Sequence, residues 1–328
     1  MKFISLFFAF LISLLLSHLF RALALKLGFL DDPSRESKIH QSSIPYLGGM
    51  AICSSFLLSS AFFHFPLPHY LLFSLLAFLL LGTLDDLLDI RVLYRLPLQF
   101  LFALVIIYIA WRFPFIPIRY LNSFLVVLFI LGGVNSLNCW DVVDGSAGAA
   151  SLAIAVSLLI YSCIFAKDVS MLLVLIGAII GWLPYNLHPA RMFLGDGGSY
   201  FLALVLSATA LHISAQLSPF QGLLPLFPFI LPFLDFIIVH YKRYKGGIKK
   251  LKYLLTSTGK DHLPHRLLAK TKSPNLASIL LFLIVLFSSL LPLIFPLNLL
   301  FIPFVLILAI YFLLDSYLPP SLENIGGD

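Results

Sequence analysis

The chain has 328 residues, of which 60% are hydrophobic and only 11% are charged. A soluble domain needs far more polar surface than this to cover its core, so the composition excludes an ordinary soluble fold and predicts an integral membrane protein. The formal net charge is +6. Basic residues in loops between apolar runs face anionic lipid headgroups more often than nucleic acid, so no nucleic-acid partner is expected.

Apolar runs long enough to cross a bilayer follow one another along the whole chain. They predict an all-α polytopic membrane protein with about eleven transmembrane helices, over residues 3–25, 47–65, 70–83, 96–111, 121–137, 147–165, 171–185, 199–215, 220–239, 276–294 and 299–314. The ninth run contains Pro225, Pro228 and Pro232. Because proline removes a backbone donor and clashes with the preceding turn, this helix is expected to be kinked or broken.

The basic residues predict the orientation of these helices. When alternate loops are assigned to alternate sides, all but four of the 21 Lys and Arg residues fall on one side, the exceptions being Lys2, Arg112, Arg119 and Lys167. The positive-inside rule makes the richer side cytosolic, with the N-terminus outside and the C-terminus inside. The chain is then a single transmembrane domain over residues 1–328, with cytosolic loops 26–46, 84–95, 135–146, 186–198 and 240–274.

Acidic residues converge on the same side of the predicted bundle. The assignment made from the basic loops places these carboxylates there as well, at helix ends or in loops: Asp31, Asp32, Asp85, Asp86, Asp89, Asp141, Asp144, Asp196 and Asp261. A solvated surface would scatter acidic residues between the two sides, and Asp168 is the main residue that departs from the pattern. A convergence of acids and bases at one face is typical of a metal and phosphate site.

Two of the acidic motifs follow helical spacing. Asp85 and Asp86 close an apolar helix, either as the carboxylates that mark its exit from the membrane or as a pair that a cation neutralises. Further along, Asn135, Asn138, Asp141 and Asp144 recur every three residues and predict one polar stripe. Such a stripe is either a packing seam between helices or a set of oxygen ligands and hydrogen-bonding groups for a cation and a sugar.

Two further motifs lie in loops. Asp196 stands among glycines directly before a helix, in the segment Phe193–Ser199. Glycines let a backbone approach a phosphate and a helix N-terminus favours an anion, although a simple glycine turn capped by Ser199 gives the same pattern. His262, His265 and Arg266 follow Asp261 in the most basic loop and are candidate donors to a diphosphate.

Together these motifs resemble the polyprenyl-phosphate N-acetylhexosamine-1-phosphate transferase superfamily. The resemblance runs from about Asp31 to Arg266 and keeps the order of the motifs: Lys38 and His40 before Pro45-x-x-Gly48-Gly49, the pair Asp85-Asp86 followed by Arg95 and Gln99, the pattern N-x-x-N-x-x-D-x-x-D-G from Asn135, F-x-G-D-x-G-S from Phe193, and Pro232-x-x-Asp235 before the two histidines. Val142 stands where the family has glycine, and Pro264 interrupts the histidine motif. The Ile44-Pro45 turn and the interrupted motif favour the N-acetylglucosamine branch.

The resemblance implies a glycosyl-1-phosphate transferase of the inner membrane with its active site on the cytosolic face. A polyprenyl phosphate, expected to be undecaprenyl phosphate, would attack the β-phosphate of a UDP-N-acetylhexosamine and release UMP, the first membrane step of cell-envelope glycan synthesis. Two alternatives stay open at this point, a phospho-N-acetylmuramoyl-pentapeptide transferase of the same superfamily and a secondary transporter, whose carboxylates would instead lie near the bilayer midplane. A homodimer also stays open.

The resemblance also implies roles for individual residues. Asp85, Asp86 and Asp196 would be catalytic, with Asp196 and Asn138 holding Mg²⁺ or Mn²⁺. The acceptor phosphate already carries most of its charge at pH 7, so the acidic pair would position it rather than take its proton. The remaining candidates would bind the substrates: Lys38, His40, Arg95, His262, His265 and Arg266 at the phosphates, and Asn135, Asp141 and Asp144 at the sugar or nucleoside.

Overall fold

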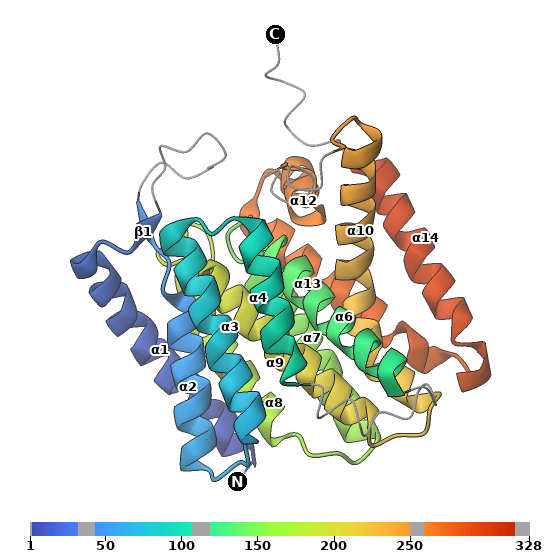
Figure 1. Ribbon diagram of the computed structural model, residues 1–328, viewed down its shortest axis with the longest axis horizontal. Helices are drawn as coiled ribbons and strands as arrows, with labels where there is room; N and C mark the ends of the chain where they lie inside the picture. The colour runs from blue at the N-terminus through green and yellow to red at the C-terminus, as the bar shows by residue number, and fades with distance from the viewer. Residues whose placement is uncertain (1, 32–42, 107–118, 250–258, 319–328) are drawn as a thin grey trace.

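The computed structural model describes residues 2–31, 43–106, 119–249 and 259–318 as a bundle of α-helices (Figure 1). In chain order the α-helices are α1 (Lys2–Leu27), α2 (Gly48–Phe62), α3 (His69–Leu88), α4 (Val92–Leu104), α6 (Arg119–Asn138), α7 (Ser146–Ile164), α8 (Ser170–Asn186), α9 (Gly195–Ser214), α10 (Ile230–Lys245), α12 (Leu263–Thr271), α13 (Pro274–Leu290) and α14 (Phe301–Tyr317). The 3-10 helices are η1 (Gln221–Phe229), η2 (Leu291–Ile294) and η3 (Leu297–Leu299). Strands β1 (Leu30–Asp31) and β2 (Ile44–Pro45) pair antiparallel.

The prediction of an all-α polytopic membrane protein is confirmed. Within the described residues, seven helical segments are long and apolar enough to cross a membrane and four shorter apolar helices accompany them. Each of the eleven predicted runs corresponds to one of these segments. The ninth begins as the 3-10 helix η1, which contains Pro225 and Pro228, and continues as α10. The expected irregularity in this helix is therefore present, and the prolines explain it.

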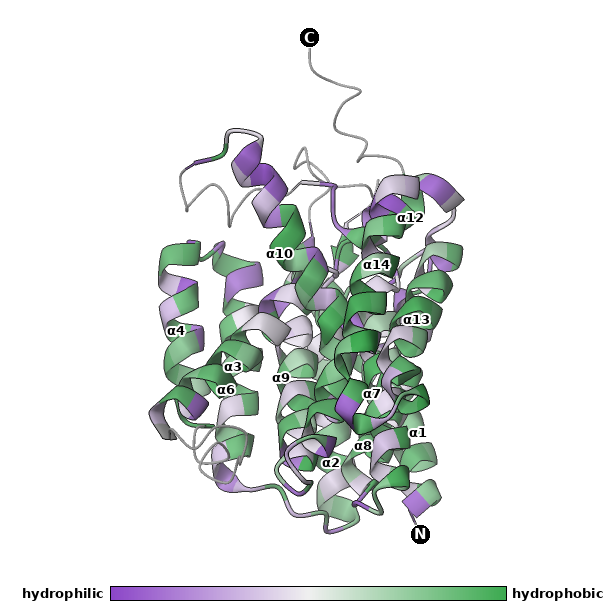
Figure 2. Cartoon of the chain, turned by 90° about the vertical axis from the view of Figure 1, so that its right-hand side faces the viewer, coloured by the Kyte–Doolittle hydropathy of each residue, from purple (hydrophilic) through white to green (hydrophobic). Residues whose placement is uncertain are grey.

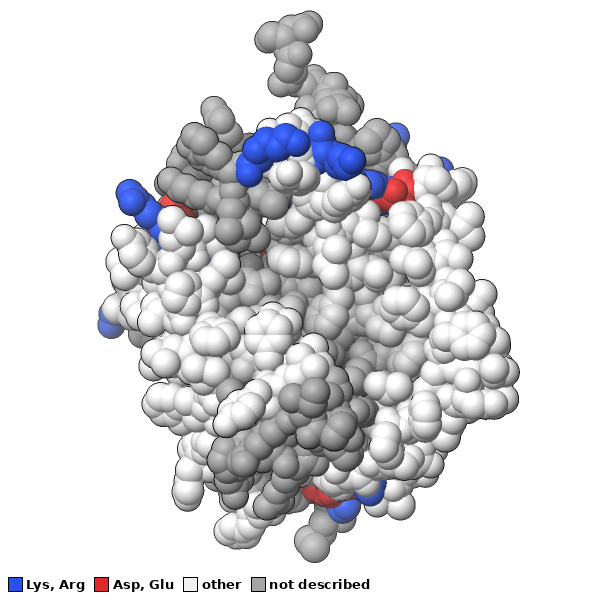
Figure 3. Space-filling view, turned by 45° about the vertical axis from the view of Figure 1, so that its right-hand side comes forward, with Lys and Arg blue, Asp and Glu red and all other residues white. Residues whose placement is uncertain are grey.

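Helix α9 forms the centre of the bundle. It contacts α2, α3, α6 and α7, and 89% of its most apolar stretch of 18 residues is buried inside the protein. By contrast, α1 and α14 turn large apolar side chains outward, such as Phe3, Phe7 and Leu313. Such exposed apolar residues are costly in water but favourable against lipid. Figure 3 shows the same division, with Lys and Arg gathered at the ends and a broad belt between them that carries neither charge.

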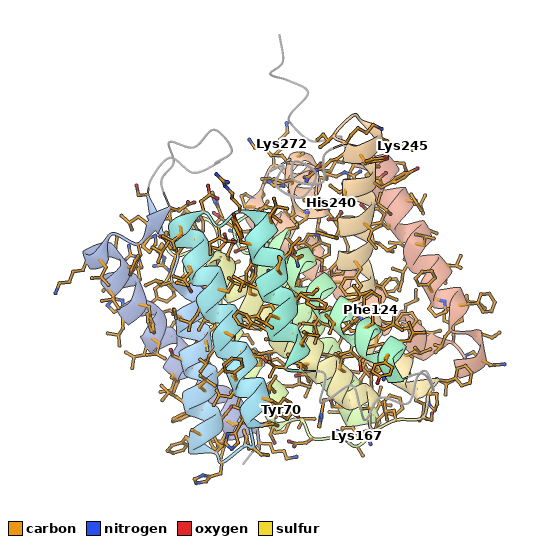
Figure 4. All side chains as sticks on the ribbon, viewed as in Figure 1. Tyr70, Phe124, Lys167, His240, Lys245 and Lys272 are labelled. Carbon is orange, nitrogen blue, oxygen red and sulfur yellow. The ribbon has the colours of Figure 1, made fainter. Side chains whose placement is uncertain are left out.

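The two ends of the bundle differ in chemistry. Lys167 and Tyr70 lie at the end that holds the N-terminus, whereas Lys245 and Lys272 lie at the other (Figure 4). Figure 2 shows the hydrophilic residues of α10 and α12 beyond the hydrophobic belt at this second end. Hydrogen bonds link the helix junctions from α3 to α4, α6 to α7 and α8 to α9 to one another. These junctions lie at the same end, because Asp235 of α10 bonds both to Trp140 after α6 and to His262 before α12. We call this the polar end of the bundle.

Helix α12 and the length of α10 were not predicted. The sequence suggested one loop over residues 240–274, but α10 continues to Lys245 and α12 forms a short amphipathic helix from Leu263. Its apolar residues Leu263 and Leu267 are buried, while Lys270 is exposed. A nine-residue helix with so few apolar residues is too short for hydropathy alone to reveal it.

Glycines allow α2 and α3 to pack directly against the N-terminal turn of α9. A Cβ atom at Gly82 would lie 2.5 Å from the carbonyl oxygen of Asp196. The opposite side of the turn is held by two backbone hydrogen bonds, from Gly48 N to Phe193 O at 3.0 Å and from Gly49 N to Leu194 O at 2.9 Å. The backbones of α2 and α3 can approach the turn this closely because the residues that face it are glycines.

We expect Gly82→Ala to destabilise the protein strongly, because the new methyl group must displace the backbone of the α9 turn. A cost of about 1–3 kcal/mol is typical of such overpacking. Thermal unfolding in detergent, followed by size-exclusion chromatography, measures it. Gly246→Ala is the comparison, since its Cβ atom would lie 3.3 Å from its nearest neighbour, Lys242 O, a contact that needs a much smaller shift than the one at Gly82. Equal melting temperatures for the two variants would contradict this account of the packing.

Candidate active site

A cluster of carboxylates and amides forms at the polar end from four different helices. Asp85 and Asp86 end α3, Asn138 ends α6, Asp196 begins α9, and Arg95 lies in the first turn of α4. The side chains meet although they are up to 111 residues apart in the chain. The three sequence motifs that contain them therefore contribute to one site.

Asp85 is buried and fully engaged by hydrogen-bond donors. Its Oδ2 atom accepts from Arg95 Nη1 at 2.7 Å and from the Tyr200 hydroxyl at 3.1 Å, while Oδ1 accepts from the backbone N–H of Ile90 at 3.0 Å. These contacts fix the turn between α3 and α4 and hold the Arg95 guanidinium against the cluster. Asp85 therefore contributes a negative charge and also holds the positively charged side chain of Arg95 in place.

Asp86 caps the N-terminus of α9. Its carboxylate accepts from the backbone N–H groups of Asp196 at 3.1 Å and Gly197 at 3.5 Å. A carboxylate at this place satisfies donors that the helix itself leaves free and interacts favourably with the helix dipole. Gly195, with φ of +77°, brings the turn so close that a Cβ atom there would lie 2.7 Å from Asp86 Oδ2.

Asp196 is more open to a ligand than Asp85. Its Oδ1 atom accepts from Asn138 Nδ2 at 2.7 Å, and its Oδ2 atom lies 4.0 Å from Arg95 Nη1. The side chain keeps 31% of its surface exposed, against 4% for Asp85. Asn138 also donates to Ser199 Oγ at 3.0 Å, so its amide plane is fixed by two contacts.

The carboxylates repel one another strongly in this arrangement. Asp196 interacts electrostatically with Asp85, Asp86 and Asp141. Like charges held together in a partly buried place favour a bound cation or a bound proton. Oxygen ligands of this kind are the ones that Mg²⁺ and Mn²⁺ prefer. The residues present therefore fit a divalent cation, although the described part of the chain contains no group of three or more His, Cys, Asp or Glu in metal-binding arrangement.

The predicted polar stripe is divided between a helix and a turn. Asn135 and Asn138 share a face at the end of α6, but α6 ends at Asn138, so Asp141 and Asp144 lie in the turn before α7. Burial, followed by the negative charges of Asp196 and Asp144, raises the pKa of Asp141 to about 8. Asp144 points to another segment: its Oδ2 atom lies 2.7 Å from His188 Nδ1 and accepts from the Ala190 N–H at 3.2 Å.

Asp235 is a buried carboxylate that bonds to several segments of the chain, and the sequence predicted no role for it. Its carboxylate is 0% exposed and accepts four hydrogen bonds. The donors are Trp140 Nε1 at 2.7 Å, His262 Nδ1 at 2.8 Å, Leu263 N at 3.1 Å and the Tyr311 hydroxyl at 3.0 Å. The motif Pro232-x-x-Asp235 marked the position, but only the contacts show that it joins α10, α12 and α14 to the turn after α6.

The two histidines of the basic loop differ in charge. Burial opposes protonation of His262, but the hydrogen bond and the charge of Asp235 outweigh it and raise the pKa of His262 to about 10. Burial and the nearby His262 lower the pKa of His265 to about 4. At neutral pH His262 is thus a cation beside Cys139, the residue that follows Asn138, whereas His265 is neutral.

Arg266, predicted to contact phosphate, is occupied elsewhere. Its guanidinium is buried and contacts the carboxylate of Asp315 at 2.5 Å, together with the backbone carbonyl groups of Asp315, Leu314 and Leu318. Lys242 contacts the same carboxylate. These contacts attach α12 and α10 to the end of α14, so the geometry favours a structural role for Arg266. Lys38 and His40 lie outside the described residues.

The fold is that of a polytopic membrane protein, and comparisons with known proteins identify it as a glycosyl transferase. A profile described as glycosyl transferase family 4 matches residues 68–214. A probable undecaprenyl-phosphate N-acetylglucosaminyl 1-phosphate transferase from Bacillus subtilis (strain 168) is 28% identical over 84% of this chain and 81% of the relative. A decaprenyl-phosphate N-acetylglucosaminephosphotransferase from Mycolicibacterium smegmatis is 28% identical over 80% of this chain and 74% of its own.

A third relative establishes membership. A phospho-N-acetylmuramoyl-pentapeptide-transferase from Thermoanaerobacter sp. (strain X514) is 30% identical over 70% of this chain and 78% of its own. The chain therefore belongs to glycosyl transferase family 4, the family of the polyprenyl-phosphate sugar-phosphate transferases. The resemblance inferred from the motifs is confirmed.

The raised pKa of Asp141 makes the stability of the metal-free protein depend on pH. Because its pKa in the folded state is about 8 and its ordinary value is 3.8, folding favours the protonated form. Asp141 then contributes stability that is fully present below pH 4 and is lost as the pH rises to 8. We expect the melting temperature in EDTA to fall over this interval less steeply in Asp141→Asn than in the wild type. Parallel curves for the two proteins would contradict the assignment.

The charge of His262 should make activity depend on Asp235. In Asp235→Asn the pKa of His262 returns toward 6.5, so we expect activity at pH 8 to fall about tenfold more than activity at pH 6. The pH profile of kcat/KM measures this. Tyr311→Phe is the matched control, because it removes one hydrogen bond from Asp235 and leaves the charge of His262 in place. Identical profiles for wild type and Asp235→Asn would exclude a role for the His262 charge.

Proposed function

We propose that this protein transfers an N-acetylhexosamine 1-phosphate from a UDP-sugar to a polyprenyl phosphate, giving the polyprenyl-diphosphate sugar and UMP. The observation that carries the proposal is the meeting of Asp85, Asp86, Asn138 and Asp196 with Arg95 at one end of a membrane bundle. A soluble nucleotide and a lipid headgroup can both reach such an end. The relatives' names supply the two substrate classes.

The chain's own residues support phosphate binding in this site. Arg95 and the protonated His262 provide positive charge, and Asp196 and Asn138 are the residues that would hold Mg²⁺ or Mn²⁺. When bound, the cation would neutralise charge that develops on the leaving UMP. Asp141, next to this cluster, is a candidate contact for the nucleoside or sugar, and Asp144, whose charge acts on Asp141, is a second candidate.

The acidic pair is better suited to positioning than to proton transfer. Asp85 already accepts three hydrogen bonds and Asp86 caps α9, so neither carboxylate is an unengaged base. The acceptor phosphate needs no base, because its second pKa is near 6 and it is mostly dianionic at neutral pH. We therefore favour direct attack of the acceptor oxygen on the β-phosphorus, with the β-phosphate to UMP bond breaking.

An apolar groove offers a place for the lipid tail. It lies between α6 and α10, has a volume of about 350 Å³, and is lined by Leu125, Leu128, Phe129, Gly132 and Phe233 among others. Nearly all of its surface is apolar, as an isoprenoid requires. With the tail in this groove and in lipid, the headgroup remains beside the polar end. We propose the inner membrane, with the polar end in the cytosol, because that end carries most of the basic residues.

The donor sugar has two candidates. The relatives from Bacillus and Mycolicibacterium are named for N-acetylglucosamine, whereas the relative from Thermoanaerobacter is named for a phospho-N-acetylmuramoyl-pentapeptide. The chemistry is the same in both, so the site geometry cannot favour one. The Ile44-Pro45 turn favours the N-acetylglucosamine branch, and a panel of UDP-sugars assayed by UMP release would decide.

We expect Asp196→Asn to reduce transfer by about 100-fold or more at every Mg²⁺ concentration, because it removes the exposed carboxylate of the cluster. Purified protein, radiolabelled UDP-N-acetylglucosamine and undecaprenyl phosphate in detergent would give a labelled lipid product. Asp168→Asn is the control, since Asp168 pairs with Lys2 at the opposite end of the bundle. Near-normal transfer by Asp196→Asn would remove Asp196 from the site, and a burst of UMP without acceptor would exclude direct attack.

A further inference from the structure

Helix α4 carries two buried N–H donors that have no hydrogen-bond partner within the described residues. They are Nε2 of Gln99 and Nε of Arg95. Gln99 is 0% exposed. Unpaired buried donors are rare in folded proteins, and the cost is greater where lipid replaces water around the helix. Each such donor calls for an explanation, and a bound ligand is one.

The orientation of the Gln99 amide is fixed by its other end. Asn135 Nδ2 donates to Gln99 Oε1 at 2.9 Å and to the Leu131 carbonyl at 2.8 Å. Reversing the Gln99 amide would set two NH₂ groups against each other, so the hydrogen-bond network assigns the free end as Nε2. Asn135, itself a predicted substrate-binding residue, thus holds Gln99 with its NH₂ group free.

Gln99 lies between the charged cluster and the apolar groove. It follows Arg95 by one helical turn on the same face of α4, and Asn135 precedes Asn138 by about one turn on α6. Asn135 also shares its face of α6 with the groove residues Leu128 and Gly132, which are seven and three positions earlier. The Gln99–Asn135 pair therefore lies about one turn deeper in the membrane-spanning region than Asp196 and Asn138.

We propose that Gln99 is a binding residue for the phosphate of the lipid acceptor, with Nε2 donating a hydrogen bond to a phosphate oxygen beside Arg95 Nε. The inference rests on the proposed function. Two donors on one face, one turn apart, match an oxyanion. A soluble nucleotide reaches the cluster from the polar end, whereas a headgroup tied to an apolar tail reaches it from the groove. A neutral amide adds a donor there without adding a charge in a region of low dielectric constant.

Gln99→Leu tests this directly, because leucine has similar volume and no donor. We expect the KM for undecaprenyl phosphate to rise about tenfold, while the KM for UDP-N-acetylglucosamine changes less than about twofold. Gln99→Glu should raise the acceptor KM further, since a carboxylate repels the phosphate. Ser136→Ala is the matched control: it removes a buried polar group on α6 whose one hydrogen bond within the described residues is to Gly133 O. Both of its KM values should match the wild type.

Three results would overturn the proposal. A rise in the donor KM alone would assign Gln99 to the nucleotide sugar. Unchanged KM values with a lowered melting temperature would assign Nε2 to a structural water. If Gln99→Leu does not fold, Gln99→Glu decides, because it keeps the size and polarity of the side chain, and an unchanged acceptor KM in that variant would overturn the proposal.

A measurement without the donor separates this inference from the proposed function. Undecaprenyl phosphate alone should raise the melting temperature of the wild type in detergent, and it should raise that of Gln99→Leu or Gln99→Glu much less. If the wild type is stabilised in this way but makes no lipid-linked sugar from any UDP-sugar, the proposed transfer fails and the acceptor site stands. Equal stabilisation of wild type and variants would overturn the acceptor site, whatever the activity.

Discussion

The close approach of the α9 N-terminal turn to α2 and α3 is the constraint on which the rest of the polar end depends. Gly82 and Gly49 leave space for the backbone of this turn, and Asp86 caps it. Only with the turn at this depth can Asp196 reach Asn138 of α6 and approach Arg95 of α4. Backbone packing inside the membrane thus determines which charges meet at its surface.

This packing concentrates negative charge that the protein alone does not neutralise. Arg95 pairs with Asp85, and the raised pKa of Asp141 lets that residue hold a proton, so Asp86 and Asp196 are the carboxylates that still call for a cation. These carboxylates repel one another at the place where a bound cation would relieve the repulsion and could in turn bind a diphosphate. Asp235 organises the opposite charge in the same neighbourhood, since it holds His262 protonated and attaches α12 to α10.

The two substrates of the proposed reaction differ in where they can approach. In this proposal a soluble nucleotide would approach from the polar end, whereas the groove between α6 and α10 is lined by apolar residues that suit a lipid tail. Gln99 and Asn135 lie where these two regions meet. A site assembled from helix ends at the membrane surface satisfies both substrates, because neither has to enter the other's solvent.

Hydropathy and charge in the sequence determined the membrane class, the succession of apolar helices and the irregular ninth one, because these depend on local composition and on proline. The motifs also identified most members of the cluster. Tertiary structure alone decided how each side chain is used: Arg266 is occupied by the end of α14, Asp144 contacts His188, and Asn135 orients the Gln99 amide. Hydrogen bonds between residues far apart in the chain have no local signature, since they depend on which helices become neighbours.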